Sequence, residues 1–126
     1  MKIIRFDKLE FIPASHEDPK SPGVFKRVLL KKPDLLAGRI EMVNWAKLPA
    51  GKSFKPHYHE DMEEVFIILN GTAKIKIDSE EEILNEGDAV VIPMGKVHEM
   101  ENISDEDVNY IALGVSLEKG GRTVNV

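Results

Sequence analysis

Short apolar runs separated by turn residues, with no long helical stripe among them, constrain the fold of this chain most strongly. Asn70-Gly71 separates the runs 63–69 and 72–78, and both central positions of a tight hairpin turn favour such residues because they need positive φ. No segment sustains a 3.6-residue apolar period beyond about ten residues. Further runs that fit strands are 24–30, 39–48, 82–84, 89–92, 98–102 and 108–116. The pattern predicts an all-β chain.

The length of 126 residues fits one domain. Many short strands without an internal repeat favour a closed barrel or a double-sheet jelly roll, because both leave few unpaired strand edges. We expect an N-terminal strand and an irregular, proline-rich arm in residues 1–23, and the barrel in residues 24–126.

Charge and cysteine content exclude several functions. The net charge of −5 argues against nucleic acid or an anionic membrane as the partner, so a small polar ligand is expected. Because the chain has no cysteine, any metal must bind to histidine and carboxylate. The first ten residues lack the apolar core of a signal peptide, and no window is apolar enough to span a membrane. A cytoplasmic protein is expected.

Candidate metal ligands are three of the four histidines and one glutamate. His57 and His59 are separated by one residue, so on a strand both imidazoles face the same side. Glu64 begins the apolar run that ends at the Asn70-Gly71 turn, and His98 follows a turn at the start of another strand. Three imidazoles and one carboxylate suit a divalent first-row metal.

Glu63 is the alternative carboxylate ligand. Strand parity favours Glu64, because Glu64 shares a face with Phe66 and Ile68. Isolated His-X-His pairs also occur on surface strands without a metal, so the histidines alone do not decide the question.

Two segments together resemble the paired signature motifs of the cupin family. Residues 51–71 are similar to the first motif and residues 87–102 to the second, with 15 residues between them. The positions that carry the resemblance are Gly51, His57, His59, Glu64, Gly71, Gly87, Pro93, Gly95, His98 and Asn102.

The resemblance implies a jelly-roll β-barrel, or double-stranded β-helix, with a metal ion bound by His57, His59, Glu64 and His98. The ion could be Fe, Mn, Ni, Cu or Zn. The glycines then serve turns of positive φ, and Asn102 is a buried hydrogen-bonding residue rather than a ligand.

Two classes of function remain open at this stage. One is a metal-dependent enzyme, of dioxygenase, decarboxylase or isomerase type, acting on a small oxygen-rich or carboxylate-containing molecule. The alternative is a non-catalytic small-molecule or sugar-binding module with a structural or ligand-assisting metal. A zinc hydrolase is less favoured, because four protein ligands around tetrahedral zinc leave no position for water.

Pocket and interface residues are less constrained by the sequence. Glu60 or Asp61 could reach a substrate at the mouth of the barrel, and Tyr110 or Arg27 could line the pocket. Small cupins commonly form homodimers through an N-terminal strand that crosses to the partner, and residues 2–6 and 24–30 could supply such strands.

Overall fold

The computed structural model describes residues 3–35, 38–117 and 122–126 and confirms the all-β prediction. Two short 3₁₀ turns, η1 (Phe6–Lys8) and η2 (Lys32–Asp34), accompany the strands. The strands are β1 (Ile12–Pro13), β2 (Phe25–Lys31), β3 (Ile40–Leu48), β4 (His57–His59), β5 (Met62–Asn70), β6 (Ala73–Ile77), β7 (Glu80–Leu84), β8 (Ala89–Ile92), β9 (His98–Asn102), β10 (Val108–Ser116) and β11 (Thr123–Asn125).

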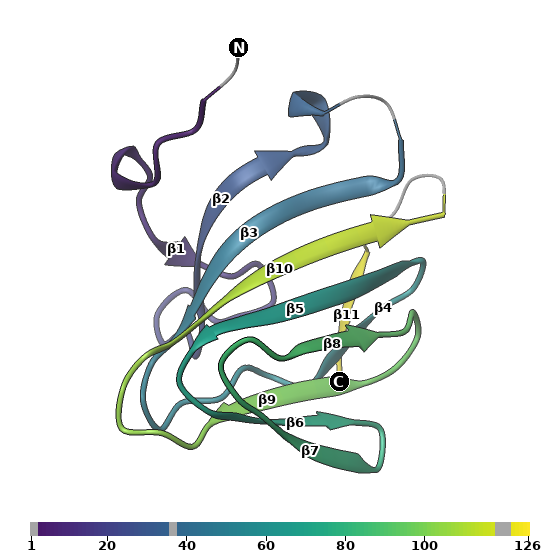
Figure 1. Ribbon diagram of the computed structural model, residues 1–126. Helices are drawn as coiled ribbons and strands as arrows, with labels where there is room; N and C mark the ends of the chain where they lie inside the picture. Colours follow the sequence, from purple (N-terminus) through teal and green to yellow (C-terminus); the bar gives the residue numbers. More distant parts are fainter. Residues whose placement is uncertain (1–2, 36–37, 118–121) are drawn as a thin grey trace.

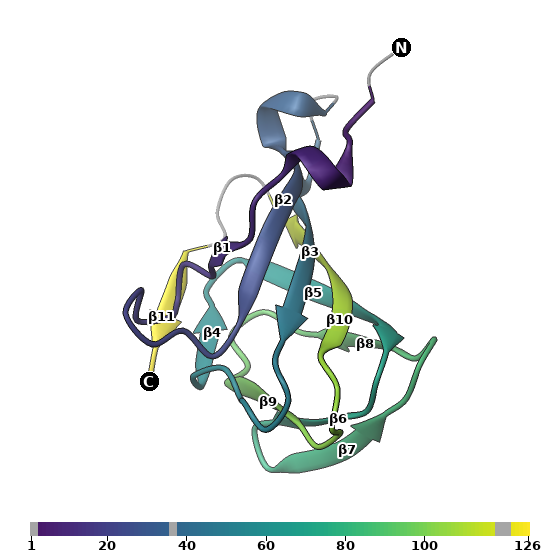
Figure 2. The same ribbon diagram turned by 90° about the vertical axis from the view of Figure 1, so that its left-hand side faces the viewer.

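The strands form two antiparallel sheets that face each other as a jelly roll (Figures 1 and 2). The six-stranded sheet has the order β1-β2-β3-β10-β5-β8, and the five-stranded sheet has the order β11-β4-β9-β6-β7. Among the described residues, no strand pairing joins one sheet to the other. The interior is therefore a sandwich whose two layers are linked by side chains and by the connecting segments.

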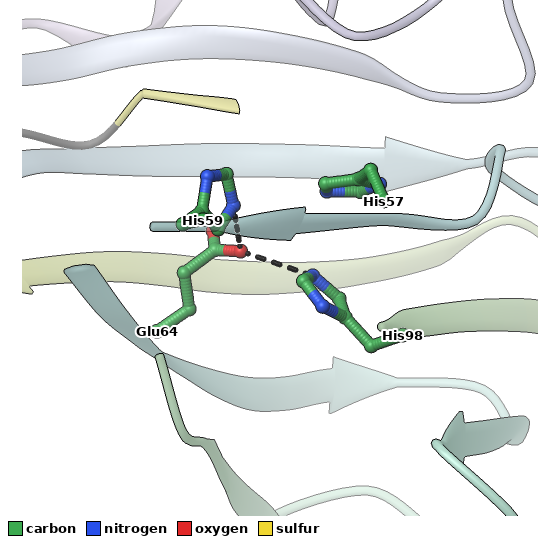
Figure 3. A group of neighbouring side chains, drawn as sticks. All are labelled: His57, His59, Glu64 and His98. Atoms are coloured by element: carbon green, nitrogen blue, oxygen red, sulfur yellow. Dashed lines mark hydrogen bonds and ion pairs between the residues drawn. The ribbon is translucent and has the colours of Figure 1, made fainter. Parts of the chain in front are cut away.

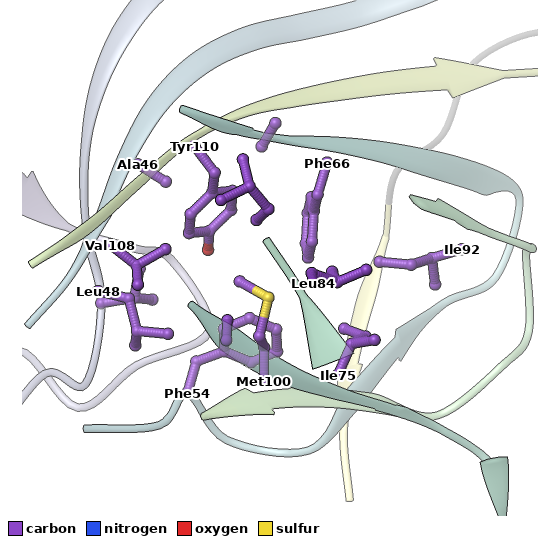
Figure 4. Packing of buried hydrophobic residues seen from close by; sticks show 14 of the residues in the cluster. Ala46, Leu48, Phe54, Phe66, Ile75, Leu84, Ile92, Met100, Val108 and Tyr110 are labelled. Carbon is purple, nitrogen blue, oxygen red and sulfur yellow. The ribbon is translucent and has the colours of Figure 1, made fainter. Parts of the chain in front are cut away.

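Alternation of buried and less buried residues places the core between the sheets. Every second residue of β10, from Val108 to Ser116, is buried, as expected for a central strand with one face inward. The fully buried side chains of Leu48 and Val108, from the six-stranded sheet, and of Met100, from the five-stranded sheet, belong to one core cluster (Figure 4). Burial of each such side chain contributes about 1.5–3 kcal/mol, so this contact layer fixes how the sheets face each other.

The chain turns between β5 and β6 at Gly71, as the sequence predicts, but the expected hairpin is wrong. β5 pairs with β10 and β8, whereas β6 pairs with β7 and β9, so this turn carries the chain from the six-stranded to the five-stranded sheet. Only Gly71 of the Asn70-Gly71 pair has positive φ. Gly71 has φ +83°, and a Cβ atom at this position would lie 2.7 Å from Cγ2 of Val108. Glycine is thus required both by the backbone conformation and by the close approach of β10. Gly51, Gly87 and Gly95 also have positive φ, in agreement with the expected turns.

The N-terminal segment departs from the sequence prediction. Residues 3–6 form no strand; η1 instead places Phe6 against Trp45 on the outer face of the six-stranded sheet, with ring centroids 4.6 Å apart. The guanidinium of Arg27 lies 4.0 Å from the ring centroid of Phe6 and 4.2 Å from that of Phe11. These cation–π contacts hold the segment on its own sheet, and residues 3–6 form no strand within the chain; residue 2 of the expected strand lies outside the described residues.

The C-terminal segment pairs as a strand. β11 runs antiparallel to β4, with Thr123 opposite His59 and Asn125 opposite His57. β4 therefore has a neighbour on each side, since His57 also pairs with His98 of β9. Within the described part of the chain, no helix is long and apolar enough to cross a membrane.

Candidate metal centre

The four predicted ligand residues come together between the two sheets (Figure 3). His57 and His59 project from β4 and His98 from β9, whereas Glu64 projects from β5 of the opposite sheet. All four are buried, and one potential ligand atom from each lies within 4.8 Å of the others. Ligands on opposite sides of an ion at about 2.0–2.2 Å are about 4.4 Å apart, so small side-chain movements would complete the site.

Each imidazole is oriented through its Nδ1 atom. His57 Nδ1 donates to the carbonyl oxygen of Lys55 at 2.7 Å, and His98 Nδ1 donates to that of Lys96 at 3.0 Å. His59 Nδ1 lies 3.0 Å from Oγ1 of Thr123. With a metal ion bound and the N–H proton on Nδ1, each Nε2 atom would offer its lone pair to the ion, as metal ligation requires.

Glu64 lies opposite these nitrogens. Its Oε1 atom is 2.7 Å from Nε2 of His59 and 3.3 Å from Nε2 of His98. Burial opposes ionisation of Glu64, but the adjacent imidazoles of His59 and His98 outweigh it and lower its pKa to about 2. The alternative ligand Glu63 is exposed, which agrees with the parity argument for Glu64.

Two observations show that the residues fit a cation. Nε2 of His98 is fully buried and has no hydrogen-bond partner among the described residues, although buried polar atoms are rarely left unsatisfied. Burial, together with the charges of His16 and His98, lowers the pKa of His57 to about 3, so its imidazole is neutral near pH 7 and able to ligate. A divalent ion would give Nε2 of His98 a partner and would bind the neutral imidazole of His57.

The proline-rich arm completes the surroundings of His57, which sequence reasoning did not anticipate. The ring of His16 stacks on that of His57, with centroids 3.9 Å apart and planes 20° apart. Glu17, itself buried, accepts hydrogen bonds from the backbone N–H groups of Gly23 and Lys55 and lies 3.0 Å from Nδ1 of His16. The arm thus holds His57 in two ways: His16 stacks on its ring, and Glu17 binds Lys55, whose carbonyl oxygen accepts from Nδ1 of His57.

A cavity of about 250 Å³ opens beside the centre and is lined by His57, His59 and Glu64. Tyr110 lines it as predicted, and burial keeps the pKa of its phenol well above the ordinary value. Arg27 does not line it, contrary to the prediction, and neither Glu60 nor Asp61 is among the lining residues. Arg27 is held on the outer face of the sheet, and Glu60 lies on the surface within 3.9 Å of Arg122.

Asn102 has the structural role that the sequence predicts. Its side-chain amide donates to the carbonyl oxygens of Leu48 and Glu106, and its Oδ1 atom accepts from the backbone N–H of Ser104. This buried network ties the end of β9 to the six-stranded sheet and lies outside the ligand set.

The sequence matches the Cupin domain family over residues 44–114, a segment that contains all four candidate ligands. With the jelly-roll topology described above, this match establishes the class of protein. The chain belongs to the cupin family.

Individual relatives agree with this assignment. The uncharacterized protein MJ1618 of Methanocaldococcus jannaschii is 30% identical over 105 residues, which are 83% of this chain and 80% of that protein. A solved structure described as a predicted oxalate decarboxylase from Thermotoga maritima has a TM-score of 0.81 at 24% identity, over 92% of this chain and 100% of that one. The polyketide cyclase RemF from Streptomyces resistomycificus has a TM-score of 0.80 at 19% identity, over 100% and 85%. At these identities the two structures show a common fold.

Proposed function

We propose that this protein is a metal-dependent cupin enzyme acting on a small oxygen-rich or carboxylate-containing molecule, with His57, His59, Glu64 and His98 as the metal ligands. The observation that carries the proposal is the convergence of three imidazole nitrogens and one carboxylate oxygen at the wall of a cavity. Structural neighbours described as an oxalate decarboxylase and a polyketide cyclase are compatible with such chemistry.

The ligand set leaves the centre attractive to anions. Three neutral imidazoles and one carboxylate around a divalent ion give a net charge near +1. When bound, such an ion supplies Lewis acidity and, if octahedral, two positions for an oxygen-containing substrate.

The chain's own residues orient and shield this site. The carbonyl groups of Lys55 and Lys96 fix two imidazoles, His16 covers one ring face of His57, and Phe66 lines the cavity as an apolar wall. Tyr110 stays protonated and can donate a hydrogen bond to a substrate oxygen.

Metal content and turnover test the proposal in that order. Protein purified without added metal is analysed for bound ions, then loaded with iron, manganese, nickel or copper. Each form is assayed for oxygen uptake and for decarboxylation of small dicarboxylates, diketones and sugar acids. We expect turnover with at least one metal and its loss in His98→Ala. Saturable ligand binding without turnover for every metal would favour the non-catalytic binding module.

We also propose that the protein is a homodimer. Strands β1 and β8 lie at the edges of the six-stranded sheet and offer unpaired backbone groups for a second copy. Light scattering at micromolar concentration should give about twice the chain mass of 14.2 kDa. A mass equal to that of one chain contradicts the dimer without affecting the metal proposal.

A further inference from the structure

Resting on the proposed function, we propose that Lys26 and Asn44 form a second subsite in the metal cavity, which selects a small hydroxycarboxylate. The carboxylate of the ligand pairs with the Lys26 ammonium, a ligand hydroxyl donates to Oδ1 of Asn44, and the remaining oxygens face the metal centre.

Lys26 is a cation that faces the interior. On β2 it lies opposite Ala46 of β3, a core residue, so its side chain shares the inner face of the sheet. It is the one lysine or arginine among the described residues that line the cavity. Within the described ranges, no hydrogen bond or ion pair involves its ammonium group.

The two carboxylates that line the cavity, Glu41 and Glu64, contact other groups and, within the described part of the chain, form no ion pair with Lys26. Glu41 also lines the cavity, but its Oε1 atom pairs with Nζ of Lys32 at 2.9 Å and accepts from the hydroxyl of Ser116. Glu64 is engaged by the imidazoles of the metal centre. Burial lowers the pKa of Lys26, and the charge of Glu64 opposes that shift. A partly desolvated ammonium of this kind attracts an anion that enters from solvent.

Asn44 supplies the second observation. Its side chain is only 7% exposed and lines the cavity, and its Oδ1 atom has no hydrogen-bond partner among the described residues. Buried amide oxygens normally accept a hydrogen bond, so we expect Oδ1 of Asn44 to accept one from a bound ligand. Asn44 is diagonal to Lys26 across β2 and β3, because Lys26 pairs with Ala46. Such neighbours lie about 7–8 Å apart at the backbone, close enough for both side chains to contact one small molecule.

The cavity limits the size of this molecule. A volume of about 250 Å³ equals the space of about eight liquid water molecules at about 30 Å³ each. A compound with roughly ten non-hydrogen atoms therefore fits inside the cavity. The combination of a cationic group, a hydrogen-bond acceptor and a centre that favours oxygen therefore points to a compact hydroxy acid.

Three probes of similar size separate these contributions. Tartrate carries both carboxylates and hydroxyls, succinate lacks the hydroxyls, and threitol lacks the carboxylates. Each is titrated by calorimetry into the Mn²⁺-loaded protein, with both tartrate enantiomers tested, while electron paramagnetic resonance monitors retention of the metal. We expect one tartrate enantiomer to bind more tightly than succinate and threitol.

Variants assign the difference to the two residues. Lys26→Met should weaken tartrate binding about 10- to 100-fold, the loss expected for one charge-assisted hydrogen bond, and Lys26→Arg should retain most of the affinity. Lys47→Met is the matched control, because it removes the same charge from the outer face of the neighbouring strand, where Nζ lies 4.3 Å from the ring centroid of Phe11. It should leave the affinity for tartrate unchanged. Asn44→Leu should bring the affinities for tartrate and succinate closer together.

The outcomes separate this proposal from the proposed function. Lys26-dependent tartrate binding without turnover by any metal form supports the subsite and contradicts the enzyme. If the protein retains none of the four metals, the metal proposal fails, and Lys26-dependent binding of tartrate to the metal-free chain still supports the subsite. The subsite is refuted if neither enantiomer binds, or if folded Lys26→Met binds tartrate within threefold of the wild type.

Discussion

Replacing Thr123 with valine tests how this centre orients its ligands. Two of the three imidazoles are held by backbone carbonyls, which no substitution removes, whereas His59 is held by the hydroxyl of Thr123 at 3.0 Å. Valine keeps the shape and the β-branched character of threonine, so pairing of β11 with β4 should persist. The variant leaves Nδ1 of a histidine that is only 7% exposed without its acceptor. Such a loss costs about 1–3 kcal/mol, which corresponds to a roughly 10- to 100-fold weaker metal affinity.

The measurement is a competition for Zn²⁺ between the protein and a chromophoric chelator of known affinity. Thr123→Ser retains the hydroxyl and serves as the matched control, with an expected affinity within threefold of the wild type. Urea unfolding of both metal-free variants checks that the fold is intact. If folded Thr123→Val binds Zn²⁺ as tightly as the wild type, then either His59 is not a ligand or its orientation does not depend on this hydrogen bond.

Three further predictions concern stability. Gly71→Ala should lower the free energy of unfolding by about 2–4 kcal/mol, because alanine at this position has an unfavourable positive φ and its Cβ overlaps with Val108. Gly51→Ala also has an unfavourable φ, but no atom lies within 4 Å of the added Cβ, so its loss should be only about 1–2 kcal/mol; equal losses in thermal melts would contradict the steric argument. The free energy of unfolding of the metal-free protein should fall by about 2 kcal/mol between pH 7 and pH 5. The pKa of His57 is about 3 in the folded state and about 6.5 in the unfolded state, so only the unfolded state gains the proton over this range; urea midpoints that do not fall would refute this prediction. Asn102→Ala should cost about 2–4 kcal/mol by leaving buried backbone groups unpaired, and chemical denaturation showing a loss below about 1 kcal/mol would mean that water replaces the amide.

Part of the candidate ligand cluster could be predicted from the sequence because part of its geometry is local, whereas the inclusion of His98, 41 residues beyond His57, rested on the resemblance to the cupin motifs. The spacing of His57 and His59 fixes a common strand face, and strand parity distinguishes Glu64 from Glu63. The turn at Gly71 could also be predicted, since it requires a residue of positive φ, but the pairing of its flanking strands could not, because each strand pairs with partners distant in the sequence. These features depend on a few neighbouring residues and on the two-residue period of a strand.

The surroundings of the centre could not be predicted, because they depend on which face of a weakly patterned strand is inward. Residues 24–30 contain apolar side chains at both parities, so the sequence did not distinguish Lys26 from Arg27. The structure places Lys26 in the cavity and Arg27 on the outer face of the sheet, whereas the residue expected from the sequence to line the cavity was Arg27. The stacking of His16 on His57 joins residues 41 positions apart through an irregular arm, and no local pattern encodes such a contact.

The acceptors behind the imidazoles are all electrically neutral: two amide carbonyls and one alcohol. In many metalloproteins a carboxylate occupies this place, draws the Nδ1 proton towards itself and makes the imidazole a stronger electron donor. Here none of the Nδ1 acceptors is a carboxylate, so the imidazoles donate less electron density to a bound cation. A cation bound by these rings would remain more electron-deficient and would polarise an incoming oxygen more strongly than one whose histidines are backed by carboxylates.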